Sequence, residues 1–201
     1  MRELSLCYDR ARWPEAQRVA KRNGTVVLNI QDGRGADRAE AKAWDTWGGS
    51  LRSLGGITLG YVDLLNTKGI RKGNDDVIAE ARTWIDAGHS GVFLDDARDR
   101  QLDTDVIAAL RKQRPKALLW ANPGTRCTGP LKASGAVLCE SEKSGKINYA
   151  SAIVIAFVKP DQVTTTRVQA AKSGVRWLAL EPLATYHVAG IEYQKKNPFT
   201  P

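Results

Sequence analysis

The sequence predicts an α/β protein, a compact (β/α)8 TIM-type barrel in a single domain. Short apolar runs alternate with longer amphipathic stretches about eight times along the 201 residues. The apolar runs are nearly continuous, which is typical of parallel strands covered by helices. No linker or low-complexity segment divides the chain, so residues 1–201 are expected to form one domain. An open doubly wound sheet is the alternative, and the lack of a GxGxxG motif after the first strand argues against it.

Eight strands are expected, each a short run rich in Val, Ile, Leu or aromatic residues that ends near Gly, Asp, Asn or Glu. They are residues 4–8, 25–30, 57–64, 91–95, 117–121, 136–140, 152–158 and 175–180. A (β/α)8 barrel has about 200 residues at the least, so this chain has little room for loops. The crossover between residues 136 and 152 is therefore expected to be degenerate, a single turn or an irregular segment.

Four helices are expected between the strands, at residues 14–22, 74–87, 103–114 and 162–173. Pro14 suits the first turn of a helix, and Gly24 follows the end of that helix. Asp75 suits the positive end of the second helix. Pro115 ends the third, because the residue before a proline is disfavoured in the helical conformation.

The charge and the composition exclude several classes of protein. The formal net charge is +8, from 30 Lys and Arg against 22 Asp and Glu. The basic residues are dispersed and no nucleic-acid-binding motif accompanies them, so nucleic acid is not the expected partner, although the charge keeps it as a third hypothesis. No apolar run reaches the roughly 20 residues of a membrane span, and no secretory signal is visible. Three cysteines and two histidines in no metal-binding spacing predict neither a metal site nor a cofactor.

Acidic residues follow two of the predicted strands at their C-terminal ends, where barrels of this kind carry their active sites. Asp95 and Asp96 end an apolar run, and Glu140 ends another. Burial and mutual repulsion are expected to raise the pKa of at least one member of the aspartate pair. Strand residues alternate between faces, so Asp95 points inward if Phe93 does, and Asp96 reaches the rim through the following turn. The alternative is that one aspartate caps the next helix and the other is solvated.

Amides, tyrosines and one more acid are the candidates for substrate binding at the same rim: Tyr8, Asn29, Tyr61, Asn122 and Glu181. A ring of acids, amides and tyrosines is what a sugar-processing site needs, because sugars are held through their hydroxyl groups and cleaved by paired carboxyls. Taken singly, Asn29, Tyr61 and Asn122 are better explained as packing or turn residues than as ligands. Trp44 and Trp47 lie in an expected loop between the second and third strands and form either a platform for a sugar ring or a helix packing face.

Taken in chain order, these residues resemble the spherulin-4-like family of glycoside hydrolases over about residues 4–185. The resemblance rests on six motifs that follow or lie on the predicted strands: Tyr8 with Trp13, residues 27–29 with Gly33 and Gly35, residues 60–62, the Trp84 helix that leads into residues 91–96, residues 122–125, and Glu140. The resemblance implies a (β/α)8 fold and an activity on α-1,4-linked galactosamine-containing polysaccharide. It also implies that Asp95, Asp96 and Glu140 are the acidic site residues.

Three features depart from the family. Its acid pair is Asp-Glu, whereas this chain has Asp95-Asp96, one methylene shorter at the second position. The chain is also short and lacks the family's secretion signal. A protein with a charge of +8 repels a cationic amino-sugar polymer, so an anionic polysaccharide is the alternative substrate.

The leading hypothesis is an endo-acting glycoside hydrolase on an amino-sugar-containing polysaccharide, retaining or substrate-assisted. Asp95 or Asp96 supplies one carboxyl and Glu140 the other, and one of them is the general acid. The alternative is a catalytically silent barrel that binds glycan or joins a structural assembly, for example a phage particle. If the resemblance holds, the protein acts outside the cell or in a virion.

Overall fold

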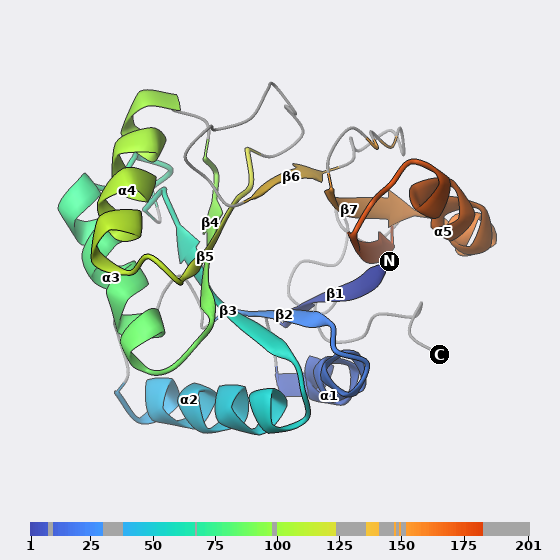
Figure 1. Cartoon of the computed structure of the whole chain (residues 1–201), viewed down its shortest axis with the longest axis horizontal. Helices are drawn as coiled ribbons and strands as arrows, with labels where there is room; N and C mark the ends of the chain where they lie inside the picture. The colour runs from blue at the N-terminus through green and yellow to red at the C-terminus, as the bar shows by residue number, and fades with distance from the viewer. Residues whose placement is uncertain are drawn as a thin grey trace.

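The computed structural model describes residues 1–7, 10–29, 38–66, 68–97, 100–123, 136–140, 147, 149 and 152–182. Eight strands run parallel to one another, and each pairs with the next in the sequence (Figure 1). They are β1 (Arg2–Cys7), β2 (Thr25–Leu28), β3 (Ile57–Asp63), β4 (Gly91–Asp95), β5 (Leu118–Ala121), β6 (Ala136–Glu140), β7 (Ile153–Val158) and β8 (Trp177–Pro182). Every expected strand overlaps one of these, and the α/β class is confirmed.

The seam between β1 and β8 is short. β1 pairs with β8 through only two residue pairs, Arg2 with Trp177 and Glu3 with Leu178, whereas β7 and β8 pair over six. The strands therefore curve as in a TIM barrel, and the last strand, β8, pairs with β1 only at the N-terminal ends of the two strands.

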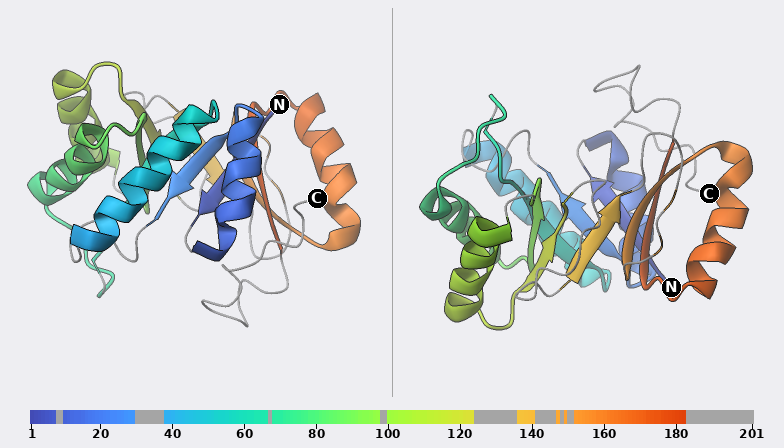
Figure 2. Two further views of the ribbon diagram at one scale, coloured as in Figure 1. Left: turned by 90° about the horizontal axis from the view of Figure 1, so that it is seen from below. Right: turned by 90° about the horizontal axis from the view of Figure 1, so that it is seen from above.

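Helices cover the outside of the strands on three sides in Figure 1. The described α-helices are α1 (Trp13–Lys21), α2 (Arg38–Ser53), α3 (Asn74–Asp86), α4 (Arg100–Gln113) and α5 (Val163–Lys172), and two 3-10 turns, η1 (Arg10–Arg12) and η2 (Pro160–Gln162), precede α1 and α5. Figure 2 shows α1 and α5 on either side of the N-terminus. Residues 124–135, between β5 and β6, and the predicted degenerate crossover after β6 lie outside the described residues, apart from residues 147 and 149.

The expected loop that carries Trp44 and Trp47 is instead helix α2, and its tryptophans pack against the core. Trp44 is 2% exposed and Leu51 is fully buried, at the spacing of one helix face. Gly48 lies inside this helix although glycine disfavours helices, and the His89 ring fills the space beside it, since a Cβ at Gly48 would lie 2.4 Å from that ring. A sugar platform on Trp44 is therefore wrong, and the packing alternative holds.

Two apolar layers lie on the two sides of the strands, as alternation of strand residues requires. The inner layer is formed by Leu4, Leu6, Val27, Leu59, Tyr61, Phe93, Trp120, Ile153, Ile155, Phe157 and Ala179. The outer layer packs the other strand faces against the helices. Gly60 lets Trp84 of α3 lie directly on β3, because a Cβ at Gly60 would be 2.1 Å from that ring. No described helix is long and apolar enough to cross a membrane.

Candidate functional site

Asp95 is the last residue of β4, and two neighbouring strands supply donors to its carboxylate. The Tyr61 hydroxyl of β3 donates to Oδ2 at 2.6 Å. The Asn122 side-chain amide, directly after β5, donates to Oδ1 at 2.7 Å. The structure thus brings together three of the residues that the sequence placed at this rim, and both oxygens of Asp95 are held in a fixed orientation.

Backbone hydrogen bonds fix the turn that follows Asp95. The Asn122 N–H donates to the Leu94 carbonyl at 2.8 Å, and the Ala97 N–H donates to the Asn122 carbonyl at 2.9 Å. Asp96 has a φ of +54°, a left-handed conformation that aspartate and asparagine tolerate better than most residues. The chain therefore turns away from the strand at Asp96, as the alternation of strand residues between the two faces predicts.

Burial raises the pKa of Asp95 above its ordinary value. The hydrogen bonds from Tyr61, from the Asp96 N–H and from Asn122 oppose that shift because they favour the ionised form, whereas the charge of Asp96 adds to it. The net direction is upward. A raised pKa on an oriented carboxyl at a strand end is the property expected of a group that exchanges a proton during a reaction.

Tyr61 is held in place from both ends. Its ring is 8% exposed and stacks on Phe93, with ring centroids 6.0 Å apart. Its carbonyl accepts a hydrogen bond from the Trp84 indole at 3.1 Å. Tyr61 is therefore a rigid donor to Asp95.

Asn29 follows β2 at the same end of the sheet. Its N–H donates to the Cys7 carbonyl at 3.0 Å. Its Oδ1 is buried and has no hydrogen-bond partner within the described structure. A buried acceptor without a donor is uncommon because it costs free energy, so Asn29 offers an open hydrogen-bonding position at the rim.

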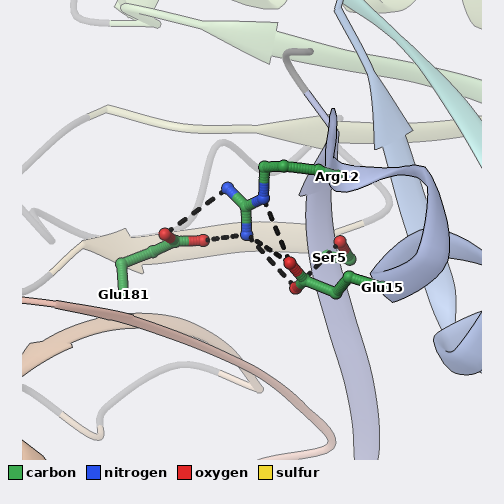
Figure 3. Close-up of polar contacts among 4 residues, drawn as sticks. All are labelled: Ser5, Arg12, Glu15 and Glu181. Carbon is green, nitrogen blue, oxygen red and sulfur yellow. Dashed lines mark hydrogen bonds and ion pairs between the residues drawn. The ribbon is translucent and has the colours of Figure 1, made fainter. Parts of the chain in front are cut away.

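Glu181 of β8 is 4% exposed and belongs to a buried ion-pair network (Figure 3). Arg12 lies between Glu181 and Glu15 of α1, with N–O distances of 3.0 Å to each. Ser5 of β1 donates to Glu15 at 3.1 Å. Burial alone would lower the pKa of Arg12, but the charges of Glu181 and Glu15 more than offset burial and raise it.

This network, which we call the Arg12 bridge (Ser5, Arg12, Glu15 and Glu181), lies at the seam between β1 and β8. The backbone pairing of the two strands ends after Glu3 and Leu178, and side chains join them beyond that point (Figure 3). The sequence named Glu181 as a rim residue but gave no signal for Arg12, whose short basic cluster resembled a solvated helix start.

Two of the predicted site residues have side chains outside the described part of the structure. Tyr8 lies outside the described residues. Glu140 is the last residue of β6 and pairs with Ile155, while its side chain lies outside the described part. Of the three predicted acids, Asp95 is the one whose carboxylate is joined to the other predicted residues, Tyr61 and Asn122. Among the described residues, no group of three His, Cys, Asp or Glu side chains is arranged to hold a metal ion.

Several solved structures are similar to this chain over about nine tenths of its length. The glycoside hydrolase domain of PelA from Pseudomonas aeruginosa matches with a TM-score of 0.58 and 15% identity, over 90% of this chain and 95% of that one. The carboxyl transferase domain of Rhizobium etli pyruvate carboxylase matches with a TM-score of 0.55 and 12% identity, over 90% of this chain and 39% of that one. CpGH84B matches with a TM-score of 0.51 and 9% identity, over 91% and 45%.

No family model and no curated protein sequence matches the chain. At these identities the structural likeness shows the fold alone. The fold is shared with a glycoside hydrolase domain and also with a carboxyl transferase, so the chemistry has to be argued from the site.

Proposed function

We propose that this protein is a glycoside hydrolase that cleaves an amino-sugar-containing polysaccharide within the chain, with Asp95 as one reacting carboxyl. The observation that carries the proposal is the Asp95 carboxyl itself, oriented by Tyr61 and Asn122 at the C-terminal end of β4 and with a raised pKa. A glycosidase needs such a group beside a second carboxyl. The fold that the chain shares with the PelA glycoside hydrolase domain supports the reaction class.

The partners of Asp95 suit a group that changes its protonation state. A hydroxyl both donates and accepts, so Tyr61 donates to ionised Asp95 and can accept from protonated Asp95. The Asn122 amide donates to the oxygen on the other side. Asp95 can therefore gain or lose a proton without losing its orientation.

Asp95 is a better candidate than Asp96 for this role. Asp95 is held by Tyr61 of β3 and by Asn122 directly after β5, whereas Asp96 lies in the turn with a left-handed backbone. We propose that Asp96 acts on Asp95 through its charge, which adds to the rise in pKa, and that Glu140 at the end of β6 supplies the second carboxyl. Asn29, with its unsatisfied Oδ1, is the proposed contact for a donor group of the sugar. Tyr8 completes the proposed binding rim, whereas Glu181, buried and paired with Arg12, is proposed to support the rim from below.

The proposal is tested by measuring the release of reducing ends from amino-sugar polysaccharides. Asp95→Asn and Glu140→Gln should each lower kcat by about 100-fold or more, because a positioned acid or base typically contributes that much. The matched control is Asp86→Asn, which also neutralises an aspartate but lies at the end of α3, near the N-terminal ends of the strands. Thermal unfolding of all three variants separates lost chemistry from lost folding. Unchanged cleavage in both Asp95→Asn and Glu140→Gln would refute the assignment.

A catalytically silent barrel that binds polysaccharide, alone or in a structural assembly, is the second candidate. The observation that favours it is that both oxygens of Asp95 already accept hydrogen bonds from the protein, as in a purely structural carboxylate. It predicts polysaccharide binding without turnover. Turnover of any polysaccharide that depends on Asp95 excludes it.

A further inference from the structure

Three arginines converge on one carboxylate at the opposite end of the strands from Asp95. Glu3 of β1 contacts Arg18 of α1 at 2.5 Å, Arg22 at 3.4 Å and Arg167 of α5 at 3.7 Å. We call these four residues the Glu3 cluster. Glu3 is the second residue of its strand, so the cluster lies at the N-terminal ends of the strands, between the two helices that flank the N-terminus in Figure 2.

The positive charge of the Glu3 cluster exceeds its negative charge. Three guanidinium groups meet a single carboxylate, which leaves two positive charges without a counterion inside the cluster. Arg2 and Arg176 are also exposed at this end of the strands, where the Arg2 N–H donates to the Arg176 carbonyl, but their side chains are not counted in the cluster. Proteins generally avoid concentrating one sign of charge in this way unless the field serves a partner.

The cluster also has hydrogen-bonding capacity that Glu3 does not use. The side chain of Arg22 is 58% exposed and that of Arg167 is 36% exposed, so solvent reaches both guanidinium groups. The Nε of Arg18 is buried and has no acceptor within the described structure. Each guanidinium carries five N–H donors in a planar fork, which matches the oxygens of a phosphate as well as those of a carboxylate.

We propose that the Glu3 cluster binds a phosphate group in its dianionic form. Two uncompensated positive charges suit a terminal phosphate, whose charge at neutral pH is about −1.5 to −2. The cluster is compact because a single carboxylate reaches three arginines. A compact site fits one doubly charged group better than the singly charged, widely spaced phosphodiesters of a nucleic acid. The phosphate is either free in solution or carried as a monoester on a lipid headgroup, and the site is independent of the proposed glycosidase reaction.

The experiment uses inorganic phosphate as the first probe and vesicles as the second. Phosphate is titrated against the whole protein at constant ionic strength, with chloride as the reference anion, and binding is followed through the arginine Nε–H signals in NMR. Vesicles of phosphatidylcholine with and without phosphatidic acid are sedimented with the protein. We expect binding in the phosphate titration, in the phosphatidic acid arm, or in both, and the arm that responds identifies the source of the phosphate.

Variants test the residues. Arg167→Gln and Arg22→Gln should each weaken binding about threefold to tenfold, because each removes charge-assisted hydrogen bonds to the anion. Glu3→Gln should strengthen phosphate binding, because it removes the carboxylate that competes with phosphate for the three arginines. Arg114→Gln is the matched control, because it removes the same charge from an exposed pair with Asp86 elsewhere on the surface, and it should leave binding unchanged. The proposal is overturned if neither probe binds, or if Arg114→Gln weakens binding as much as Arg167→Gln.

Discussion

The Tyr61 hydroxyl donates a hydrogen bond of 2.6 Å to the Asp95 carboxylate, across 34 residues of chain and from one strand to the next. Trp84, packed in the space that Gly60 leaves, fixes the backbone of Tyr61 from the other side of β3. The orientation of the Asp95 carboxyl thus depends on α3, a helix on the other side of the sheet from that carboxyl.

Replacement of Tyr61 by Phe should raise the pKa of Asp95 further. The Tyr61 hydrogen bond favours the ionised carboxylate and lowers the pKa of Asp95, whereas burial raises it. Loss of the hydrogen bond therefore leaves the effect of burial less opposed. The limb of the pH profile for polysaccharide cleavage that reports Asp95 should shift toward higher pH, whichever limb that is, and kcat/KM measured against pH will show it. Ser53→Ala, which deletes an exposed hydroxyl on α2, is the control and should leave the profile in place. A Tyr61→Phe profile that matches the wild type would contradict the role of this hydrogen bond.

The raised pKa of Asp95 should make folding stability depend on pH in a defined direction. The folded state holds the proton more tightly than the unfolded chain, whose aspartate has a pKa of about 4. The favourable contribution of the protonated group is therefore complete below about pH 4 and is lost as the pH rises through the folded value. Asp95→Asn carries no charge at any pH. Urea unfolding across this range should show the variant gaining stability relative to the wild type as the pH rises, and a constant difference would contradict the shift.

Arg12→Met should strongly destabilise the protein. It leaves Glu15 and Glu181 buried without their shared cation, and breaking a buried pair typically costs about 3–5 kcal/mol. The double variant Arg12→Met/Glu181→Gln should recover part of the loss, because it removes one of the stranded charges. Denaturant unfolding measures both. Arg114→Met, which opens an exposed ion pair, is the control and should change stability little.

Gly60→Ala and Gly49→Ala should have opposite effects on stability. A Cβ at Gly60 would lie 2.1 Å from the Trp84 ring, whereas one at Gly49 in α2 would meet nothing closer than 3.8 Å. The first should cost about 1–3 kcal/mol through overpacking, and the second should gain about 0.5–1 kcal/mol through helix propensity. Thermal unfolding distinguishes the two, and equal effects would contradict the packing of Trp84 on β3.

The strands could be predicted from the sequence because each is a local apolar run, and the end of β4 at Asp95 agrees with the prediction. Helix α2 could not be predicted, because Gly48 indicates a loop. Only the folded structure shows that the His89 ring occupies the space beside Gly48. The sequence placed Tyr61, Asp95 and Asn122 at one rim, but the hydrogen bonds that join them depend on strand register. The Arg12 bridge could not be predicted, because nothing local connects residue 12 with residue 181.

The Arg12 bridge joins positions 169 residues apart, and this separation bears on how the molecule is made. While the chain emerges from the ribosome, β1 and α1 precede the other strands and helices of this domain, and Arg12 has Glu15 alone as a partner until Glu181 of β8 has been synthesised. Closure of the seam is thus a late event of high contact order, which favours slow folding. A nascent chain that ends before Glu181 should remain open at β1, where chaperones and proteases can recognise it.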